Sequence, residues 1–215
     1  MHLDADTFIF FGALVVAVIL HEISHGVVAL WLGDDTAKRA GRLTLNPIPH
    51  IDPFGSIILP AIAALSGFAG IGYAKPVPVN PNRLRNPKRD YLWVSLAGPA
   101  TNLLLMSIAA LAAHFVFRGL THPASGLLID YPLGFRVLFL FAVVNLALGV
   151  FNLLPIPPLD GSAIFEQFMP ESWRPGWYRF RQYGILIIFA LVFWTGLGAK
   201  VIDPLVSRLI DFIVS

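Results

Sequence analysis

The sequence predicts an all-α integral membrane protein, folded as a polytopic bundle of helices. Its 215 residues are 56% hydrophobic and 13% charged, and the mean hydropathy is +0.72. Soluble domains carry about 25% charged residues. Half that share, together with long uncharged runs, indicates a bilayer environment. The length fits one membrane domain over residues 1–215, without a separate soluble module.

Four apolar runs are long enough to predict membrane helices. A helix rises about 1.5 Å per residue, so roughly 20 apolar residues cross a hydrocarbon core of about 30 Å. The first run contains no titratable side chains other than His21, Glu22 and His25. The four predicted helices cover residues 8–32, 91–117, 137–154 and 183–199.

Three further segments are predicted to contact the membrane without crossing it as a regular helix. Residues 55–73 are apolar but interrupted by Pro60 and three glycines, which predicts a broken or re-entrant segment. Residues 74–80 alternate prolines with valines, a pattern typical of an edge strand or extended segment. They predict a small membrane-associated β segment. Residues 166–181 carry Trp and Arg and predict an interfacial stretch.

The basic residues favour one orientation of these segments. If the N-terminus lies outside and 55–73 does not fully cross, the loops 33–54, 71–90 and 157–182 lie inside. Those loops hold eleven of the 15 Lys and Arg residues. The arrangement agrees with the positive-inside rule, whereas a full crossing by 55–73 would place a basic cluster outside.

Composition also excludes several kinds of site and partner. A net charge of +2, spread over short clusters, gives no nucleic-acid footprint. The chain has no cysteine, which excludes disulfides, iron–sulfur clusters and thiolate metal sites. Any metal must therefore be held by His and carboxylate side chains.

The first membrane helix carries a metal-binding pattern, H-E-x-x-H, at residues 21–25. Residues four apart lie one helical turn apart on the same face, so His21 and His25 can bind one zinc ion. Glu22 is then placed to take a proton from a metal-bound water. Short motifs match by accident in soluble proteins, but three ionisable side chains within a membrane helix are costly and indicate a functional site.

A catalytic zinc site needs a third protein ligand and an open position. Asp160 is the candidate, because it follows a membrane helix interrupted by three prolines. Irregular backbone at membrane depth is tolerated where it lines a cavity or is buried in protein. The alternative is a solvated turn or N-cap residue before Gly161, and spacing alone leaves both open.

The paired blocks H-E-I-S-H-G (21–26) and F-N-L-L-P-I-P-P-L-D-G (151–161) resemble the site-2 protease family of intramembrane zinc metalloproteases. The blocks run in the family's order, and residues after 161 carry no matching motif. Three further blocks agree: L-N-P-I-P-H-I-D-P-F-G (45–55), A-K-P-V-P-V-N-P (74–81) and L-A-G-P-A-T-N (96–102).

The resemblance implies a three-helix catalytic core and one zinc ion held by His21, His25 and Asp160, with Glu22 as general base. It suggests Asn152 near the substrate backbone or the oxyanion. Asn102 and His50 are further candidates for the substrate-binding site. Both asparagines can also be read as hydrogen-bonding links between helices, and His50 as a ligand-orienting or purely structural loop residue.

The resemblance therefore predicts a zinc-dependent endopeptidase that cuts transmembrane or membrane-proximal substrates within the bilayer. It predicts a multi-pass protein of a prokaryotic cell membrane, compact and without PDZ or nucleotide-sensing domains. The expected partners are a membrane-protein substrate with a transmembrane segment and the lipid bilayer. The alternatives are a membrane metal-ion transporter and a non-catalytic homologue that binds membrane segments without cutting them.

Overall fold

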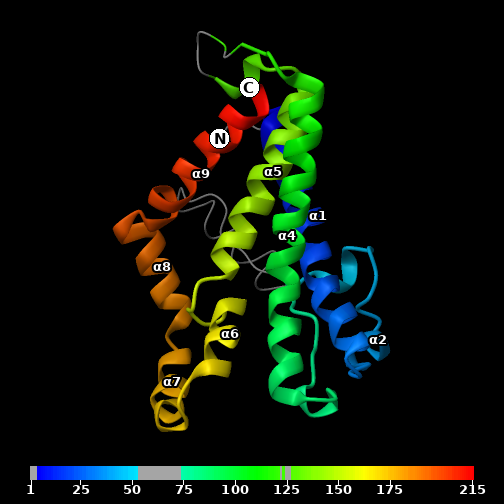
Figure 1. The fold of residues 1–215 in the computed structure, drawn as a ribbon, viewed down its shortest axis with the longest axis vertical. Coiled ribbons are helices and arrows are strands. Elements are labelled where there is room, and N and C mark those ends of the chain that lie inside the picture. The colour runs from blue at the N-terminus through cyan, green and yellow to red at the C-terminus, as the bar shows by residue number, and fades with distance from the viewer. Residues whose placement is uncertain (1–3, 53–73, 122, 124–126) are drawn as a thin grey trace. The chain divides into compact units, whose positions relative to one another are not determined.

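The computed structural model describes residues 4–52, 74–121, 123 and 127–215 (Figure 1). Within these residues the regular structure is helical and contains no strand, which confirms the all-α prediction. The small β segment predicted over 74–80 is wrong. The predicted re-entrant segment, 55–73, lies outside the described residues.

Residues 74–80 run without a strand partner because most of their N–H groups are absent or already used. Two of the seven residues are prolines, which have no N–H to donate to a ladder. Three others donate to groups in other segments. The acceptors are the His50 carbonyl for Lys75 (2.9 Å), the Glu22 carboxylate for Val77 (2.7 Å) and the Asp34 carboxylate for Asn80 (2.6 Å).

Three helices of the described residues are long and apolar enough to cross a membrane. They contain 27, 31 and 20 residues, and at about 1.5 Å per residue each reaches about 30 Å or more. They confirm the first three predicted membrane helices, with ends shifted by a few residues. These helices are α1 (Ala5–Trp31), α4 (Pro87–Phe117) and α5 (Leu133–Asn152).

The fourth predicted helix, 183–199, is wrong in its extent because Gly196 divides it. Gly196 has a φ of +62°, a left-handed conformation that glycine adopts without steric penalty and that ends helices. Helix α8 (Gly184–Thr195) stops there, and α9 (Leu197–Val214) follows. The 12 residues of α8 rise only about 18 Å, less than the hydrocarbon core.

Short helices connect these longer ones. The predicted interfacial stretch over 166–181 falls on the end of α6, on η5 and on α7. The short helices are α2 (Thr36–Arg39), η1 (Ile48–His50), η3 (Pro81–Arg83), η4 (Leu128–Asp130), α6 (Asp160–Phe168), η5 (Glu171–Trp173) and α7 (Arg174–Arg181).

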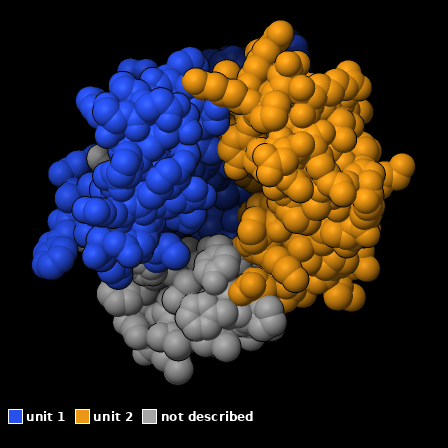
Figure 2. Space-filling model, turned by 90° about the horizontal axis from the view of Figure 1, so that it is seen from below, with its two compact units in different colours: residues 1–17, 99–215 blue, residues 18–98 orange. Residues whose placement is uncertain are grey.

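The chain forms two compact units, which Figure 2 colours separately. One unit contains Met1–Ala17 and Pro99–Ser215, and the other contains Val18–Gly98. The division falls within α1 and within α4. The prediction of a single domain over 1–215 stays a prediction.

In the unit of Met1–Ala17 and Pro99–Ser215, the core lies where α5 packs against α4 and α9 (Figure 1). Alanines of α4 meet large aromatic side chains of α5, and α9 adds aliphatic ones. Small residues opposite large ones let helices approach closely in a membrane. The buried members include Ala109, Ala110 and Ala113 of α4, Phe135 and Phe139 of α5, and Leu209 and Ile213 of α9.

Two fully buried asparagines join the helices of the same unit. The Asn102 Nδ2 donates to Asn145 Oδ1 (2.8 Å) and to the Ala17 carbonyl (3.3 Å). Asn145 Nδ2 donates to the carbonyl of Phe141 in its own helix (2.9 Å). These bonds connect α1, α4 and α5, so they favour the reading of Asn102 as a link between helices.

We expect a double-mutant cycle of Asn102→Ala and Asn145→Ala to give a coupling energy of about 0.6–1.7 kcal/mol, the range of polar pairs between membrane helices. Reversible unfolding in mixed detergent micelles measures it. Pairing either change with Ser107→Ala is the control, because the Ser107 hydroxyl donates to the Leu103 carbonyl of its own helix rather than to another helix of the described chain. Strict additivity of the two asparagine changes would contradict the link.

Candidate metal centre

Two imidazoles of α1 lie together in the unit of Val18–Gly98. His21 and His25 are one helical turn apart and are only 7% and 8% exposed. Their Nε2 atoms are 3.1 Å apart. Two nitrogens bound to one tetrahedral zinc ion would be about 3.3 Å apart, given Zn–N distances of about 2.0–2.1 Å. The pair therefore fits two ligands of the same metal ion.

A backbone carbonyl orients the second imidazole. The Nδ1 of His25 lies 2.6 Å from the carbonyl oxygen of Val94 in α4. A carbonyl oxygen only accepts hydrogen bonds, so Nδ1 carries the proton and Nε2 keeps its lone pair. Protein zinc ligands are commonly held in this way, with the second ring nitrogen donating to a carbonyl or carboxylate.

Gly98 keeps the space in front of both rings open. A Cβ added at this position would lie 2.6 Å from His21 Nε2 and would overlap His25 Nε2. Both ligand atoms therefore face the bare backbone of α4, where any side chain would take the place of a ligand or an ion. This glycine belongs to the L-A-G-P-A-T-N block, but its role depends on a facing helix that the sequence does not reveal.

Glu22 is half-buried, and one of its carboxylate oxygens is already held. Its Oε2 accepts a hydrogen bond of 2.7 Å from the N–H of Val77. No other residue of the described chain donates to Glu22, so Oε1 remains available to take up a proton. The backbone of 74–80 thus orients the carboxylate that the sequence predicts to be the general base.

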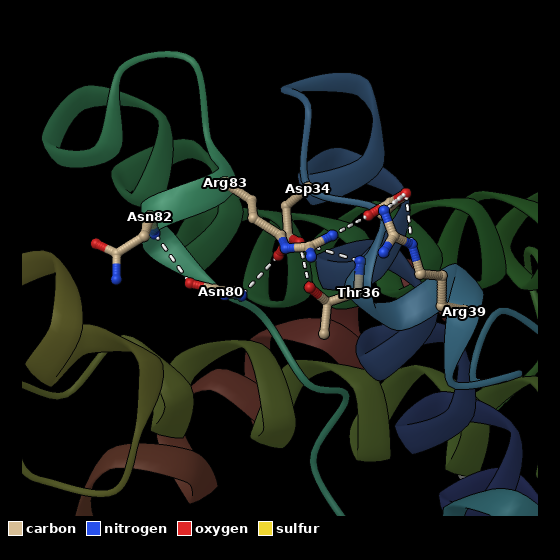
Figure 3. Close-up of polar contacts among 7 residues, drawn as sticks. Asp34, Thr36, Arg39, Asn80, Asn82 and Arg83 are labelled. Atoms are coloured by element: carbon tan, nitrogen blue, oxygen red, sulfur yellow. Dashed lines mark hydrogen bonds and ion pairs between the residues drawn. The ribbon is translucent and has the colours of Figure 1, made fainter.

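A second carboxylate fixes the same backbone segment just beyond the end of α1 (Figure 3). Asp34 is fully buried. It accepts bonds from the N–H of Thr36 (3.0 Å), from the Thr36 hydroxyl and from the N–H of Asn80 (2.6 Å). Segment 74–80 is therefore held at two points. Glu22, within α1, binds the N–H of Val77, and Asp34, just after α1, binds the N–H of Asn80.

An exposed ion-pair cluster lies next to Asp34. Asp35 accepts from Arg39 Nε (2.7 Å) and from Arg83 Nη1 (2.7 Å), as Figure 3 shows. The hydrogen bond from Arg39 is the main cause that holds the pKa of Asp35 below its usual range. These contacts join α2 to η3, outside the membrane-spanning part of α1.

Asp160 is the first residue of α6 in the other unit and is half-buried. The turn before it is tightly closed, because a Cβ at Gly161 would overlap the carbonyl oxygens of Leu153 and Leu154. The glycine of the L-D-G sequence is therefore needed for the close return of the chain after α5. Asp160 is the first residue of α6, and Leu159 is the N-cap. The alternative reading of Asp160 as a turn or N-cap residue therefore does not agree with the structure.

The other predicted site residues have local backbone partners. Asn152 ends α5, and its Nδ2 donates to the Leu148 carbonyl of the same helix (3.0 Å). His50 is 3% exposed, and its Nε2 lies 2.9 Å from the Thr44 carbonyl. The contacts of His50 close its own loop, as a structural residue would.

Comparison with known proteins decides the family. The model of peptidase family M50 matches residues 133–195. YwhC of Bacillus subtilis (strain 168), provisionally named a zinc metalloprotease, is 40% identical over 196 residues, which are 90% of this chain and 84% of that protein. The chain belongs to peptidase family M50.

Two more distant relatives of this M50 peptidase carry similar names. Rip2 of Mycolicibacterium smegmatis, provisionally named a zinc metalloprotease, is 31% identical over 83% of this chain and 64% of its own length. The zinc metalloprotease MJ0392 of Methanocaldococcus jannaschii is 22% identical over 77% of this chain and 35% of its own length. No solved structure matches the chain. The predicted family and the predicted class, zinc metalloprotease, are confirmed.

The sequence did not predict the contacts of three residues described above. Asp34 and Asn145 were not recognised, and Gly98 was noted only as a point of close helix approach. An Asp followed two residues later by a free backbone N–H commonly forms an Asx turn, so a local signal for Asp34 was present. Asn145 lies in an otherwise apolar run, where a lone amide predicts a partner on another helix.

We expect Gly98→Ala to weaken zinc binding by about 10–100-fold, as changes that disturb the orientation of zinc ligands do. The added methyl group must push at least one imidazole out of position. Zinc content of the purified protein, measured by mass spectrometry after dialysis against a weak chelator, checks this. Gly12→Ala in the same helix as both histidines is the control, because nothing lies within 4 Å of its added Cβ. Equal zinc retention in both variants would contradict the role of Gly98.

Proposed function

We propose that this M50 peptidase hydrolyses peptide bonds of membrane proteins at a zinc ion held by His21, His25 and Asp160, with Glu22 as the general base. The observation that carries the proposal is the pair of buried imidazoles that face the bare backbone at Gly98. The zinc metalloprotease names of its relatives support zinc as the metal.

The donor set supports Asp160 as the third ligand. Zinc in hydrolases takes three protein ligands from His and carboxylate or thiolate groups and keeps one position open. This chain has no cysteine, so the third ligand is another imidazole or a carboxylate. Asp160 lies in a block typical of the family and offers a carboxylate held by a tight turn.

Zinc, when bound, polarises water and stabilises negative charge on the substrate carbonyl oxygen. Glu22 Oε1 takes the proton of the attacking water as the water oxygen bonds to the carbonyl carbon. When the C–N bond breaks, the same carboxyl group gives the proton to the leaving nitrogen. The N–H of Val77 keeps Oε2 in place throughout, so the proton moves on and off one defined oxygen.

Asn152 is a further candidate in this reaction. One N–H of its amide is directed at Leu148, which leaves the second N–H to donate to a developing oxyanion. A preformed donor of this kind accounts for about 10²–10³-fold in kcat where it has been removed from other hydrolases. We propose this role for Asn152 and assign Asn102 to helix packing.

The position of the motif supports a substrate with a transmembrane segment. His21 and His25 lie on α1, one of three helices apolar enough to span the bilayer. A helical substrate has its carbonyls in hydrogen bonds and must unwind locally before attack. Strand addition to 74–80 is not available for this, because that segment has already used or lacks most of its N–H groups. We further propose a multi-pass bacterial-type membrane protein with the basic loops inside.

We expect Glu22→Gln to retain zinc and to lower the cleavage rate of a membrane substrate in detergent by at least 10²–10⁴-fold, since an amide cannot accept the proton. Cleavage is followed on gels, and zinc is measured on the same samples. Glu171→Gln is the control, because the side chain of Glu171 is 81% exposed. Substantial cleavage by Glu22→Gln would remove the mechanism.

We expect Asp160→Ala to lose zinc as well as activity, since two imidazoles alone hold the ion weakly. The measurement is the zinc stoichiometry of purified wild type and variant. Asp203→Ala, at an exposed position of α9, should keep the ion. A full complement of zinc in Asp160→Ala would show that another residue completes the site.

A further inference from the structure

We propose that α6, η5 and α7 form a binding surface for anionic phospholipids. The surface, called here the α6–α7 surface, combines an apolar hollow with two arginines of α7. It lies within a single unit of the chain. The residues that line its hollow fall between 165 and 180 and include none of those assigned to the zinc site.

The hollow is lined mainly by large apolar side chains. Its volume is about 480 Å³. The ring of Trp177 lies 5.3 Å from the ring of Phe165 and 5.5 Å from that of Phe180, measured between centroids. The Tyr178 hydroxyl donates to Glu166 (3.0 Å) and fastens α7 to α6. The other lining residues include Met169, Trp173 and Gly176.

The arginines flank the apolar face of α7. At 100° per residue, Gly176, Phe180 and Trp177 fall within one arc of about 100°. Arg179 lies about 60° beyond one edge of this arc, and Arg181 about 40° beyond the other. A helix with cations on both sides of an aromatic face lies in the plane of a membrane interface, with its apolar side towards the acyl chains.

The charges of this surface are only partly balanced within the protein. Arg174 pairs with Glu171 (3.1 Å). Arg179 and Arg181 are exposed, and neither forms an ion pair with any residue that the structure describes. Two unbalanced guanidinium groups beside an apolar hollow complement a molecule with a phosphate and an acyl chain. An anionic phospholipid has both, and Arg binds phosphate in a bidentate fashion.

The exposed aromatic residues favour lipid over a soluble anion. Trp173, which lines the hollow, is 62% exposed, and Phe168 at the end of α6 is 73% exposed. Trp is enriched at the headgroup level of bilayers, where its ring is partly in hydrocarbon. A soluble phosphate would leave these side chains and the hollow uncovered.

The test uses the full chain in nanodiscs that contain phosphatidylcholine and phosphatidylglycerol. Brominated acyl chains quench tryptophan, and brominating one lipid at a time gives the relative binding constant of the two lipids. The contribution of Trp177 is obtained by difference from Trp177→Phe. We expect Trp177 to prefer phosphatidylglycerol by up to roughly fivefold for each arginine, and this preference should fall as salt is raised.

Two variants decide whether the arginines cause the preference. Arg179→Gln with Arg181→Gln should bring the relative binding constant at Trp177 close to one. Lys200→Gln with Arg208→Gln removes the same charge from exposed positions of α9 and should leave the preference unchanged. A constant near one in the wild type, an unchanged preference in the α7 variant, or displacement of lipid by soluble glycerol phosphate would each overturn the proposal.

Discussion

Two neighbouring imidazoles on an apolar helix are the constraint around which the unit of Val18–Gly98 is arranged. Nitrogen lone pairs directed at each other within 3.1 Å are unfavourable unless a cation or a proton lies between them. The carbonyl of Val94 fixes the tautomer of His25, and the missing side chain of Gly98 leaves room for an ion. Both features come from α4, so the proposed metal site requires α4 to pack against α1 at this level.

Carboxylates replace a strand partner for residues 74–80. The side chains of Glu22 and Asp34 bind the N–H groups of Val77 and Asn80, as a neighbouring strand would, but at only two points. Asp34 is fully buried and makes three hydrogen bonds, so its charge is well compensated. The arrangement couples the orientation of Glu22, the proposed general base, to the end of α1, which no isolated motif could achieve.

Structural features that depend on one segment of the chain could be predicted from the sequence. Features that depend on contacts with a second segment could not. The H-E-x-x-H spacing gave the two imidazoles because helical geometry alone places them on one face. The alternation of Pro and Val over 74–80 predicted a β segment wrongly, because the acceptors of its N–H groups lie elsewhere in the chain. The break at Gly196 was missed because hydropathy stays high across it.

The surroundings of a buried polar side chain in this apolar protein depend on the residue that faces it from the neighbouring helix. Where an amide can reach a partner on a neighbouring helix, as Asn102 reaches Asn145, the pair satisfies itself and needs no ligand. Where the facing position is a glycine, as at Gly98, no Cβ of that helix fills the space next to the rings of His21 and His25. The residue on the facing helix therefore differs between the asparagine pair and the imidazole pair. Under the proposed function, this difference separates the link at Asn102 from the metal site at His21, although both are buried polar residues of long apolar helices.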